Sequence, residues 1–310
     1  MRCLVTGGAG FIGSNLVDAL LARGDEVTVV DDLSTGRTVN LEPGLANGAE
    51  LVEMDIRDRE ALSRLAGEKR PEAIFHLAAQ IDVRKSLADP FFDASINVGG
   101  TANVLEAART SECGRVVSIS TGGAIYGEGE GQRLPLPEDA PIAPLSAYGQ
   151  SKFAAEGYVS LYERLYGLSG VSLRLGNVYG PRQDPLGEAG VIAIFCGLLK
   201  EGGRPTVFGD GTQTRDYIYV GDVVSAALAA GDSEATGPIN IGTGRETNVL
   251  ELVEALAELS GRDDFEPEFA PPRTGEVQAI SVDAGRAERE LGWRAEMDLR
   301  EGLRVTLDSI

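Results

Sequence analysis

The sequence has little of the chemistry that metal sites and disulfide scaffolds require. Its 310 residues include three cysteines, which lie far apart and form no CxxC pair, and one histidine. These counts argue against a zinc site or a disulfide framework, and we predict that no metal is bound. Cys3 and Cys113 flank apolar runs and are expected to be small core residues. His76 stands in the apolar stretch "AIFHLAA" and is expected to be a buried, hydrogen-bonded side chain rather than a base.

Positive charge is also scarce, and long apolar runs are absent. The chain has 28 Lys and Arg against 48 Asp and Glu, a formal net charge of −20. Such a surface repels nucleic acids and anionic lipids, so we expect neither as a partner. The first predicted strand begins directly at "MRCLVTG", without a signal peptide, and no apolar run reaches membrane length. We therefore expect a cytoplasmic protein without a membrane partner.

A regular alternation of strand and helix patterns is present instead. Apolar, β-branched runs predict strands at residues 2–6, 26–30, 50–54, 72–78, 115–120 and 171–176. Helical spacing predicts helices at residues 11–24, 93–111, 146–167 and 191–202, with Ser146 as the N-cap of the third. Residues 134–144 and 177–190 are expected to be loops. This order predicts a Rossmann-type, doubly wound parallel sheet, followed from about residue 176 by a smaller α/β lobe whose later segments cross back.

The first motif, "TGGAGFIG", follows a strand and opens a helix. Gly7, Gly10 and Gly13 allow a tight turn and a close approach of the backbone to a pyrophosphate, which faces the amides of the helix N-terminus. Asp31 and Asp32 end the second strand in "VVDD". A carboxylate at Asp31 accepts hydrogen bonds from a ribose hydroxyl and repels a 2′-phosphate, so the predicted cofactor is NAD rather than NADP.

The second motif is "YGQSK". Tyr148 and Lys152 are four residues apart and therefore share one face of the predicted helix. A tyrosine with a pKa of about 10 is a poor base at neutral pH, but a nearby ammonium and a positive nicotinamide favour its phenolate. The pair predicts a catalytic base, Tyr148, supported by Lys152.

These motifs resemble the UDP-glucose 4-epimerase family of the extended short-chain dehydrogenase/reductase superfamily. The resemblance covers nearly the whole chain and includes, in family order, "DDLSTG", "DIRD", "HLAAQ", "NVGGTANVLEA", "NVYGPRQ", "GDGTQTRDYIYV" and "NIGTG". It implies an NAD-binding domain at residues 1–175 and a nucleotide-sugar-binding domain at residues 176–310. It also implies a homodimer that interconverts UDP-glucose and UDP-galactose through a 4-keto sugar, with a UDP-hexose as substrate.

The resemblance assigns roles to individual residues. Beyond the three glycines, the implied cofactor contacts are Phe11, Ile12, Asp31, Asp32, Ser34, Asp55, Ile56, Leu77, Ala78, Ala79, Asn97, Ser120, Tyr148 and Lys152. The implied substrate contacts are Thr121, Gly122, Gly123, Tyr148, Asn177, Val191, Thr206, Phe208, Arg215 and Arg273. Arg215 and Arg273 suit a diphosphate, because guanidinium groups fork onto phosphate oxygens.

The stretch "STGGAIYG" departs from the family pattern. Family members carry a Ser or Thr that bonds the sugar 4-hydroxyl and relays its proton, and the aligned residue here is Gly122. Either the relay is lost and Tyr148 contacts the sugar directly, or Thr121 supplies the hydroxyl. Gly122 and Gly123 favour the second account, since a backbone without side chains adopts unusual conformations and lets the sugar approach. We predict that Thr121, Tyr148 and Lys152 are catalytic and that a valine at Gly122 crowds the sugar pocket.

Other reactions of the superfamily fit the sequence less well. Sugar 4,6-dehydratases carry Asp-Glu where this chain has Gly123 and Ala124, and uronate epimerases place a second arginine where Asp184 stands. The 2-substituent of the sugar and the choice between UDP and dTDP stay open. Epimerases of UDP-N-acetylglucosamine, UDP-glucuronate or a dTDP-hexose are therefore alternatives. A non-catalytic NAD-binding protein is another, against which the pair Tyr148 and Lys152 argues.

Overall fold

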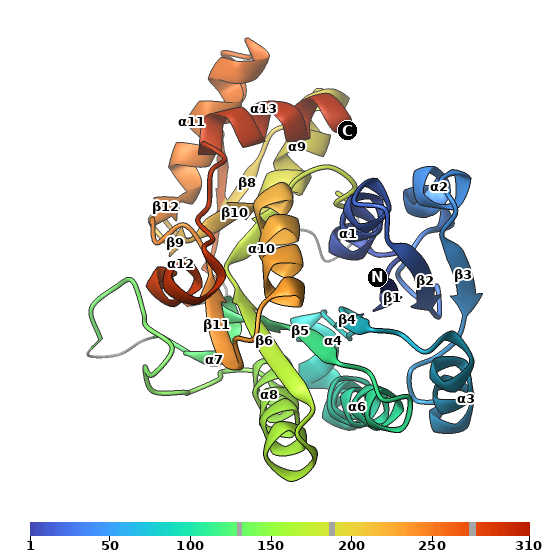
Figure 1. The fold of residues 1–310 in the computed structure, drawn as a ribbon. Helices are drawn as coiled ribbons and strands as arrows, with labels where there is room; N and C mark the ends of the chain where they lie inside the picture. The colour runs from blue at the N-terminus through green and yellow to red at the C-terminus, as the bar shows by residue number, and fades with distance from the viewer. Residues whose placement is uncertain (129–131, 186–189, 273–276) are drawn as a thin grey trace.

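A seven-stranded sheet runs through the computed structural model, which describes residues 1–128, 132–185, 190–272 and 277–310. The strand order is β11-β6-β5-β4-β1-β2-β3, and every neighbouring pair is parallel (Figure 1). The strands from the first part of the chain are β1 (Arg2–Thr6), β2 (Glu26–Asp31), β3 (Glu50–Glu53), β4 (Ala73–His76), β5 (Arg115–Thr121) and β6 (Ser169–Leu175). The predicted Rossmann-type, doubly wound sheet is confirmed.

Each face of the sheet has its own apolar core, because successive residues of a strand point to opposite faces. Val5 and Val29 pack with α1 (Phe11–Ala22), α10 (Val220–Asp232) and α12 (Gly285–Leu291). Leu4 and Val30 pack with α3 (Arg59–Lys69), α6 (Thr101–Thr110) and α8 (Ala147–Tyr166) on the other face. A further helix, α2 (Thr38–Ala46), packs against α1. Cys3 and Cys113 belong to these cores, as predicted.

The long helix α8 begins and ends where its sequence signals place it. The Ser146 hydroxyl accepts a hydrogen bond from the Gly149 backbone nitrogen at 3.1 Å and so caps the first turn. Gly167 follows the last turn with a φ of 68°, a conformation that glycine adopts at low cost. Both predicted ends of the helix are confirmed.

Residues 93–111 do not form the single helix that their pattern predicts. The chain forms α4 (Val83–Ala88) and α5 (Pro90–Ala94), continues as a π-helix, η1 (Ser95–Gly100), and only then becomes α6. A π-turn inserts one residue into the helical repeat, which apolar spacing does not reveal. Asn97 lies in this π-helix.

In the part of the second lobe that the structure describes, three short strand pairs and three helices lie around one core cluster. The pairs are β7 (Asn177–Tyr179) with β10 (Tyr217–Tyr219), β8 (Thr206–Phe208) with β13 (Glu268–Ala270), and β9 (Thr214–Arg215) with β12 (Thr247–Asn248). The helices are α9 (Val191–Glu201), α11 (Val249–Ser260) and α13 (Leu299–Ser309), which lie together at the top of Figure 1. The prediction of a loop from residue 177 is wrong for its first three residues, which form β7.

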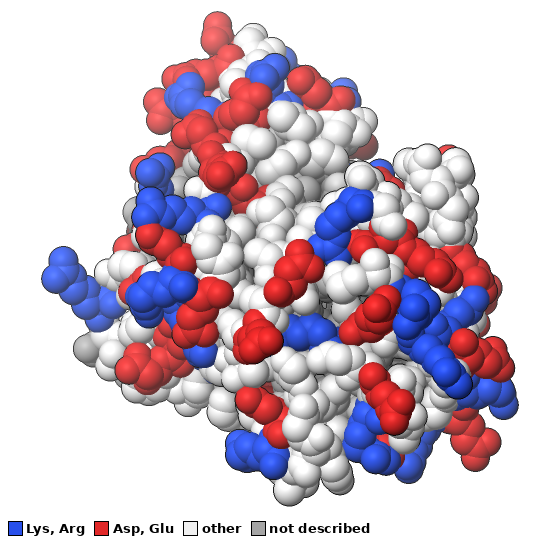
Figure 2. Space-filling model, in the orientation of Figure 1, with Lys and Arg blue, Asp and Glu red and all other residues white. Residues whose placement is uncertain are grey.

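Strand β11 (Gly237–Ile241) returns from the second half of the chain to the large sheet, where it pairs with β6. The division of the chain at residue 175 stays a prediction, because β11, α10 and α12 all pack with the first lobe. Acidic and basic side chains lie interspersed on the face shown in Figure 2. Among the described residues, no helix combines the length and the apolar character that a membrane span needs.

Candidate active site

The turn after β1 is too tight for side chains. Gly7 has a φ of 72°, and a β-carbon on it would lie 2.5 Å from the Ala78 backbone nitrogen. A β-carbon on Gly13 would overlap the Gly7 carbonyl oxygen. No side chain caps α1 at Gly10, and its first turn holds no acidic residue. The N-terminal amides of α1 thus suit an anionic group, and the cradle fits a dinucleotide pyrophosphate.

The glycine turn lies at the point where the strand order reverses. β1 pairs with β2 on one side and β4 on the other, and dinucleotides bind at such a switch point, beyond the carboxyl ends of the strands. Leu77, Ala78 and Ala79 follow β4 directly and are partly exposed. The Leu77 nitrogen donates to the Thr6 carbonyl at 3.0 Å, which holds this segment beside the turn. The structure thus brings two of the predicted cofactor segments together.

The Asp31 side chain is buried behind the glycine turn. Its Oδ2 accepts a hydrogen bond from the Ala9 nitrogen and its Oδ1 one from the Leu33 nitrogen, both at 2.9 Å. Burial raises the pKa of this carboxyl, and the two amides partly oppose that shift. Each oxygen keeps a second lone pair with which it can accept from a ribose hydroxyl. Asp32 accepts from the nitrogen and hydroxyl of Ser34 at 3.0 and 2.6 Å, so it shapes the following turn.

The residues that the resemblance places near the adenine occupy two environments. Asp55 forms an ion pair with Arg57 at 2.5 Å, near the surface. Ile56 is buried, and its side chain packs against Gly100 so closely that a β-carbon there would overlap it. Asn97 is also buried, and its amide is engaged in full.

The Asn97 side chain holds the segment that follows β4. Its Oδ1 accepts from the Gln80 nitrogen at 2.8 Å, and its Nδ2 donates to the Gln80 carbonyl at 2.9 Å and to the Ser151 hydroxyl at 3.0 Å. The π-helix therefore links the segment that follows β4 to α8. This arrangement gives Asn97 a supporting place behind the predicted cofactor site.

Tyr148, Lys152 and Thr121 meet between α8 and the end of β5. A hydrogen bond with the Thr121 hydroxyl lowers the pKa of the Tyr148 phenol, but desolvation of the ring hydroxyl has the larger effect and raises this pKa to about 12. Lys152 is 6% exposed, and burial lowers the pKa of its ammonium to about 8, while Glu156 and Asp93 partly restore it. The three predicted catalytic residues are therefore adjacent, in an apolar setting that opposes both charges.

The two glycines of "STGGAIYG" have different neighbours. Both lie in the short helix α7 (Gly122–Ile125), and neither has a positive φ. A β-carbon on Gly122 would lie 2.8 Å from the Val282 side chain, inside a core cluster, whereas one on Gly123 would face the Asn177 Oδ1 at 3.2 Å and the Thr121 Oγ1 at 3.9 Å. The expectation of an unusual backbone is therefore wrong. Whether a valine at Gly122 crowds the sugar pocket stays a prediction, and Gly123 is the glycine whose β-carbon would face Asn177 and Thr121.

Ser120, predicted as a cofactor contact, is engaged inside the protein. Its hydroxyl donates to the Glu156 Oε1 at 2.5 Å, and the side chain is buried. His76 is likewise buried and lies 2.7 Å from the Thr6 hydroxyl and 2.9 Å from the Thr101 hydroxyl. Burial, aided by Lys152, lowers the pKa of His76 to about 3, so its imidazole is neutral. The prediction of a hydrogen-bonded core histidine is confirmed.

The predicted substrate residues are only partly brought together. Asn177 begins β7, beside Gly123, and its nitrogen donates to the Asp216 carbonyl at 2.7 Å. Arg215 ends β9 and Asp216 follows it directly, so Asn177 and Arg215 lie on adjoining segments. Phe208 is linked to the same region, since its carbonyl accepts from the Gln213 side chain at 3.0 Å.

The remaining predicted substrate residues are more peripheral. Thr206 begins β8 and is exposed, and Val191 begins α9. Arg273 lies outside the described residues. Of the predicted substrate residues, Thr121, Gly123 and Asn177 lie side by side.

Sequence reasoning missed the buried charges that hold this site together. Asp216 is buried and accepts four hydrogen bonds through its carboxylate, from Thr243, Gly244 and Val282. Glu156 and Arg174 form a buried ion pair at 2.7 Å behind Lys152. The available signal was a charged residue within an apolar run, as in "VSLRLG" and "FAAEGYV".

The fold and these residues define a nucleotide-dependent enzyme of the Rossmann class, and comparison with known proteins defines its family. Residues 3–242 match the NAD dependent epimerase/dehydratase family, and the chain belongs to this family. A UDP-glucose 4-epimerase of Mycolicibacterium smegmatis is 48% identical over 310 residues, which cover 99% of this chain and 98% of that protein.

Two solved structures are similar over the full chain. A UDP-glucose 4-epimerase with UDP-glucose from Thermotoga maritima has a TM-score of 0.96 and 44% identity, and the match covers 100% of this chain and 98% of that one. A Thermus thermophilus UDP-glucose 4-epimerase in complex with NAD has a TM-score of 0.90 and 45% identity, with the same coverage.

Proposed function

We propose that the protein is an NAD-dependent 4-epimerase that interconverts UDP-glucose and UDP-galactose. The observation that carries this proposal is the meeting of Thr121, Tyr148 and Lys152 at the carboxyl end of β5. The glycine turn follows β1, and the carboxyl ends of parallel strands lie at one edge of a sheet. A proton acceptor and a dinucleotide cradle therefore share that edge. The relatives named above support the nucleotide and the sugar.

The cradle supplies the first half of the mechanism. Gly7, Gly10 and Gly13, with the amides of Phe11 and Ile12, would hold the pyrophosphate of NAD, and Asp31 a ribose hydroxyl. When bound, NAD supplies a hydride acceptor that becomes the hydride donor of the return step.

The chain's own side chains handle the proton. The Tyr148 phenolate accepts the proton of the sugar 4-hydroxyl as the C4–H bond breaks, which leaves a 4-keto sugar. Tyr148 gives this proton back when hydride returns to the opposite face of C4. The Thr121 hydroxyl, bonded to the phenol, lies where it can also contact the sugar oxygen. The Lys152 ammonium favours the phenolate by its positive charge.

Substrate binding involves the second lobe together with α7. Asn177 and Gly123 would face the sugar, and Arg215 would meet the diphosphate as a planar cation with paired donors. We also propose Val191, Thr206, Phe208 and Arg273 as contacts of the nucleotide, on the family resemblance. We further infer a cytoplasmic location, with which the three free, buried cysteines agree.

The test of this function is a substrate panel with product analysis. Purified protein is denatured and the released nucleotide identified, and native protein is incubated with UDP-galactose and with the matching dTDP-hexose. We expect released NAD and conversion of UDP-galactose to UDP-glucose. Tyr148→Phe serves as the inactive control, because its ring packs as before without the proton acceptor. Release of NADP, or conversion only of the dTDP-sugar, contradicts the proposal.

We also propose that the protein is a homodimer. The helices α4, α5 and α8 pack against one another and leave large apolar side chains in solvent. These are Val83, Leu87, Phe91, Phe92, Phe153, Tyr158, Leu165 and Tyr166, with Phe91 84% exposed. Monomeric proteins rarely expose so many apolar residues on adjoining elements, so a second copy is the expected cover.

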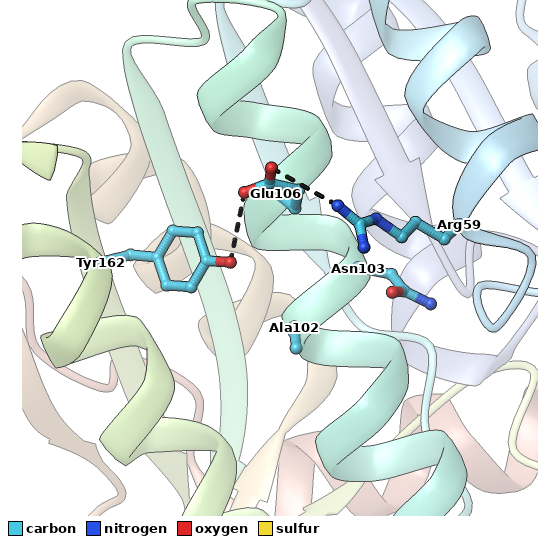
Figure 3. A pocket seen from close by; sticks show the side chains of 5 residues that line it. All are labelled: Arg59, Ala102, Asn103, Glu106 and Tyr162. Carbon is cyan, nitrogen blue, oxygen red and sulfur yellow. Dashed lines mark hydrogen bonds and ion pairs between the residues drawn. The ribbon is translucent and has the colours of Figure 1, made fainter.

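A shallow pocket lies beside this apolar surface. Figure 3 shows Arg59, Ala102, Asn103, Glu106 and Tyr162 around it, contributed by α3, α6 and α8. Glu106 accepts from the Tyr162 hydroxyl at 3.3 Å and lies 3.8 Å from Arg59. These polar groups suit the rim of an interface whose centre is apolar.

Light scattering at micromolar concentration tests the dimer. We expect the wild type to have twice the mass of the chain and Phe91→Glu to be a monomer, because a carboxylate cannot be buried in an apolar interface without a partner. Phe269→Glu is the matched control, since Phe269 is 60% exposed on β13 in the other lobe. A wild-type monomer overturns the proposal.

A further inference from the structure

A buried ion pair lies directly behind the catalytic residues of α8. Glu156 follows Lys152 by one helical turn, and its carboxylate receives the Arg174 guanidinium through Nη2 at 2.7 Å and Nε at 3.0 Å. Both side chains are almost completely buried. The Ser120 hydroxyl donates to the same carboxylate at 2.5 Å. Glu156 therefore has a single, fixed position between α8, β5 and β6.

The other side of Arg174 is equally well fixed. Its Nη1 donates to the Tyr126 hydroxyl at 2.8 Å and to the Glu138 carbonyl at 2.9 Å. The Tyr126 hydroxyl in turn donates to the Asn240 Oδ1 at 2.8 Å. The network thus extends from α8 through β6 to β11, and every member of it is hydrogen-bonded.

A contribution to the stability of the fold does not by itself explain why Glu156 and Arg174 are charged residues. A buried ion pair is often no more stabilising than apolar residues of the same size, because removing two charges from water offsets their attraction. This pair does have a second effect, since it brings one negative charge within a helical turn of Lys152. Among the described residues no ion pair includes Lys152 itself, and Glu156, one turn further along α8, is the carboxylate that most raises the pKa of its ammonium.

We propose that Glu156, fixed by Arg174 and Ser120, is a positioning residue that places a negative charge one helical turn from Lys152 and so keeps Lys152 charged beside Tyr148. The inference rests on the proposed function, in which the Lys152 ammonium favours the Tyr148 phenolate. Glu156 acts through Lys152. Ser120 also precedes Thr121 in β5, so the same carboxylate fixes the strand end that presents the Thr121 hydroxyl.

The other charged groups around Lys152 do not replace Glu156. Asp93 from α5 acts on Lys152 in the same direction, but more weakly. His76 from β4 is neutral, since its pKa lies at about 3. Arg174 from β6 is paired with Glu156, and without that partner its positive charge would oppose the ammonium of Lys152.

The experiment uses the full-length protein and two measurements. The first is the pH dependence of kcat and KM with UDP-galactose. The second is the titration of the Tyr148 phenol by absorbance in the NAD-bound protein, where the positive nicotinamide lowers the pKa of the phenol toward the pH range in which Lys152 is still charged. It is taken as the difference between each protein and its Tyr148→Phe counterpart. The second measurement needs no turnover and reports the ionisation of one residue.

We expect Glu156→Gln to change both measurements. Without the carboxylate, Lys152 loses its proton at a lower pH, so the alkaline decline of kcat moves down by about one pH unit. The phenol then titrates at higher pH, because the ammonium that supports its phenolate is lost. At pH 8, kcat falls about fivefold, while KM changes less than kcat.

Two further variants complete the test. Glu163→Gln removes a carboxylate from the same helix, about two turns further on, and is expected to leave both titrations in place. Glu156→Asp keeps the charge but withdraws it by one methylene, so it should move both titrations in the same direction by a smaller amount. It is the deciding variant if Glu156→Gln does not fold.

The outcomes separate three conclusions. If Glu156→Gln or Glu156→Asp lowers the melting temperature but leaves both titrations unchanged, the pair is only structural and the inference is overturned. If the titration of Tyr148 moves while the wild type converts no UDP-galactose, the positioning role stands and the proposed function is wrong. Movement of the titration and of the kcat profile together supports both.

Discussion

Thr243 donates two hydrogen bonds to one oxygen of the Asp216 carboxylate, from its backbone nitrogen at 2.8 Å and from its hydroxyl at 2.6 Å. The other carboxylate oxygen accepts from the nitrogens of Gly244 at 3.0 Å and Val282 at 3.2 Å. The loop after β11 is therefore fixed to the residue that follows Arg215. This relationship connects the large sheet to the segment that would meet the diphosphate.

We expect Asp216→Asn to weaken sugar binding selectively. An amide has one acceptor oxygen, so at least one of the three backbone amides that donate to this carboxylate, those of Thr243, Gly244 and Val282, would face an NH₂ group and lose its bond. The KM for UDP-galactose should rise about tenfold, while the amount of bound NAD stays unchanged. Asp210→Asn, in an exposed turn closed by Thr212, is the matched control. An unchanged KM in Asp216→Asn contradicts this prediction.

Thr121→Val tests whether Thr121 supplies the hydroxyl that the aligned Gly122 lacks. Valine has nearly the shape of threonine but makes no hydrogen bond to the Tyr148 phenol or to a sugar oxygen. We expect kcat to fall about tenfold or more, as the loss of a polar transition-state contact does. The phenol should also titrate at higher pH, because the Thr121 bond lowers its pKa. A wild-type kcat would mean that Tyr148 works without a relay.

The two glycines of α7 should respond differently to valine. Gly123→Val places methyl groups beside Thr121 and Asn177, so sugar affinity should fall while NAD stays bound. Gly122→Val forces methyl groups against Val282 and the Arg174 carbonyl, so the melting temperature should fall. Isothermal titration with UDP-glucose, with UDP as the sugar-free control, and thermal unfolding of both variants distinguish the two effects. Equal loss of sugar affinity in both would show that Gly122 also lines the pocket.

His76 makes the free energy of unfolding depend on pH in a way that one substitution can isolate. Its pKa is about 3 in the folded protein and near 6.5 when unfolded. The unfolded state therefore binds more protons below pH 6.5, and His76 contributes stability above that pH which is lost as the pH falls toward 3. Because the chain has one histidine, a substitution of His76 removes the entire histidine contribution to the pH dependence of the free energy of unfolding.

Urea unfolding at pH 7 and pH 5.5 measures this contribution. His76→Gln should be less stable than the wild type at pH 7, since it loses hydrogen bonds with Thr6 and Thr101. Its stability should fall less between the two pH values, by about 1 kcal/mol. Parallel pH dependences of the two proteins would show that His76 is not neutral in the folded state.

The sequence predicts the large sheet well because its strands are buried on both faces. Such strands read as continuous apolar runs, as in "RVVSIS" for β5, and the glycines between β1 and α1 mark a turn that only glycine can form. The boundaries of α8 follow from Ser146 and Gly167 for similar local reasons. In each of these cases the signal lies within a few residues of the feature.

Features that depend on distant contacts escape such reasoning. The π-helix around Asn97 adds one residue to a turn, and inside it Asn97 bonds to Gln80 and Ser151, which lie far from it in the sequence. The place of Gly122 against Val282 depends on a residue far away in the chain. The pairing of Glu156 with Arg174 likewise joins a helix to a strand, and neither residue alone reveals it.

The return of β11 to the large sheet has a consequence for the growing polypeptide. Until residues 237–241 have left the ribosome, β6 is the edge of the sheet, and its apolar residues Val171, Leu173 and Leu175 have no neighbouring strand on that side. Unpaired apolar edges attract other chains. Synthesis must therefore pass through a stage in which the nucleotide-binding half is present but its sheet still lacks β11. Chains that stall at this stage are the ones most exposed to aggregation.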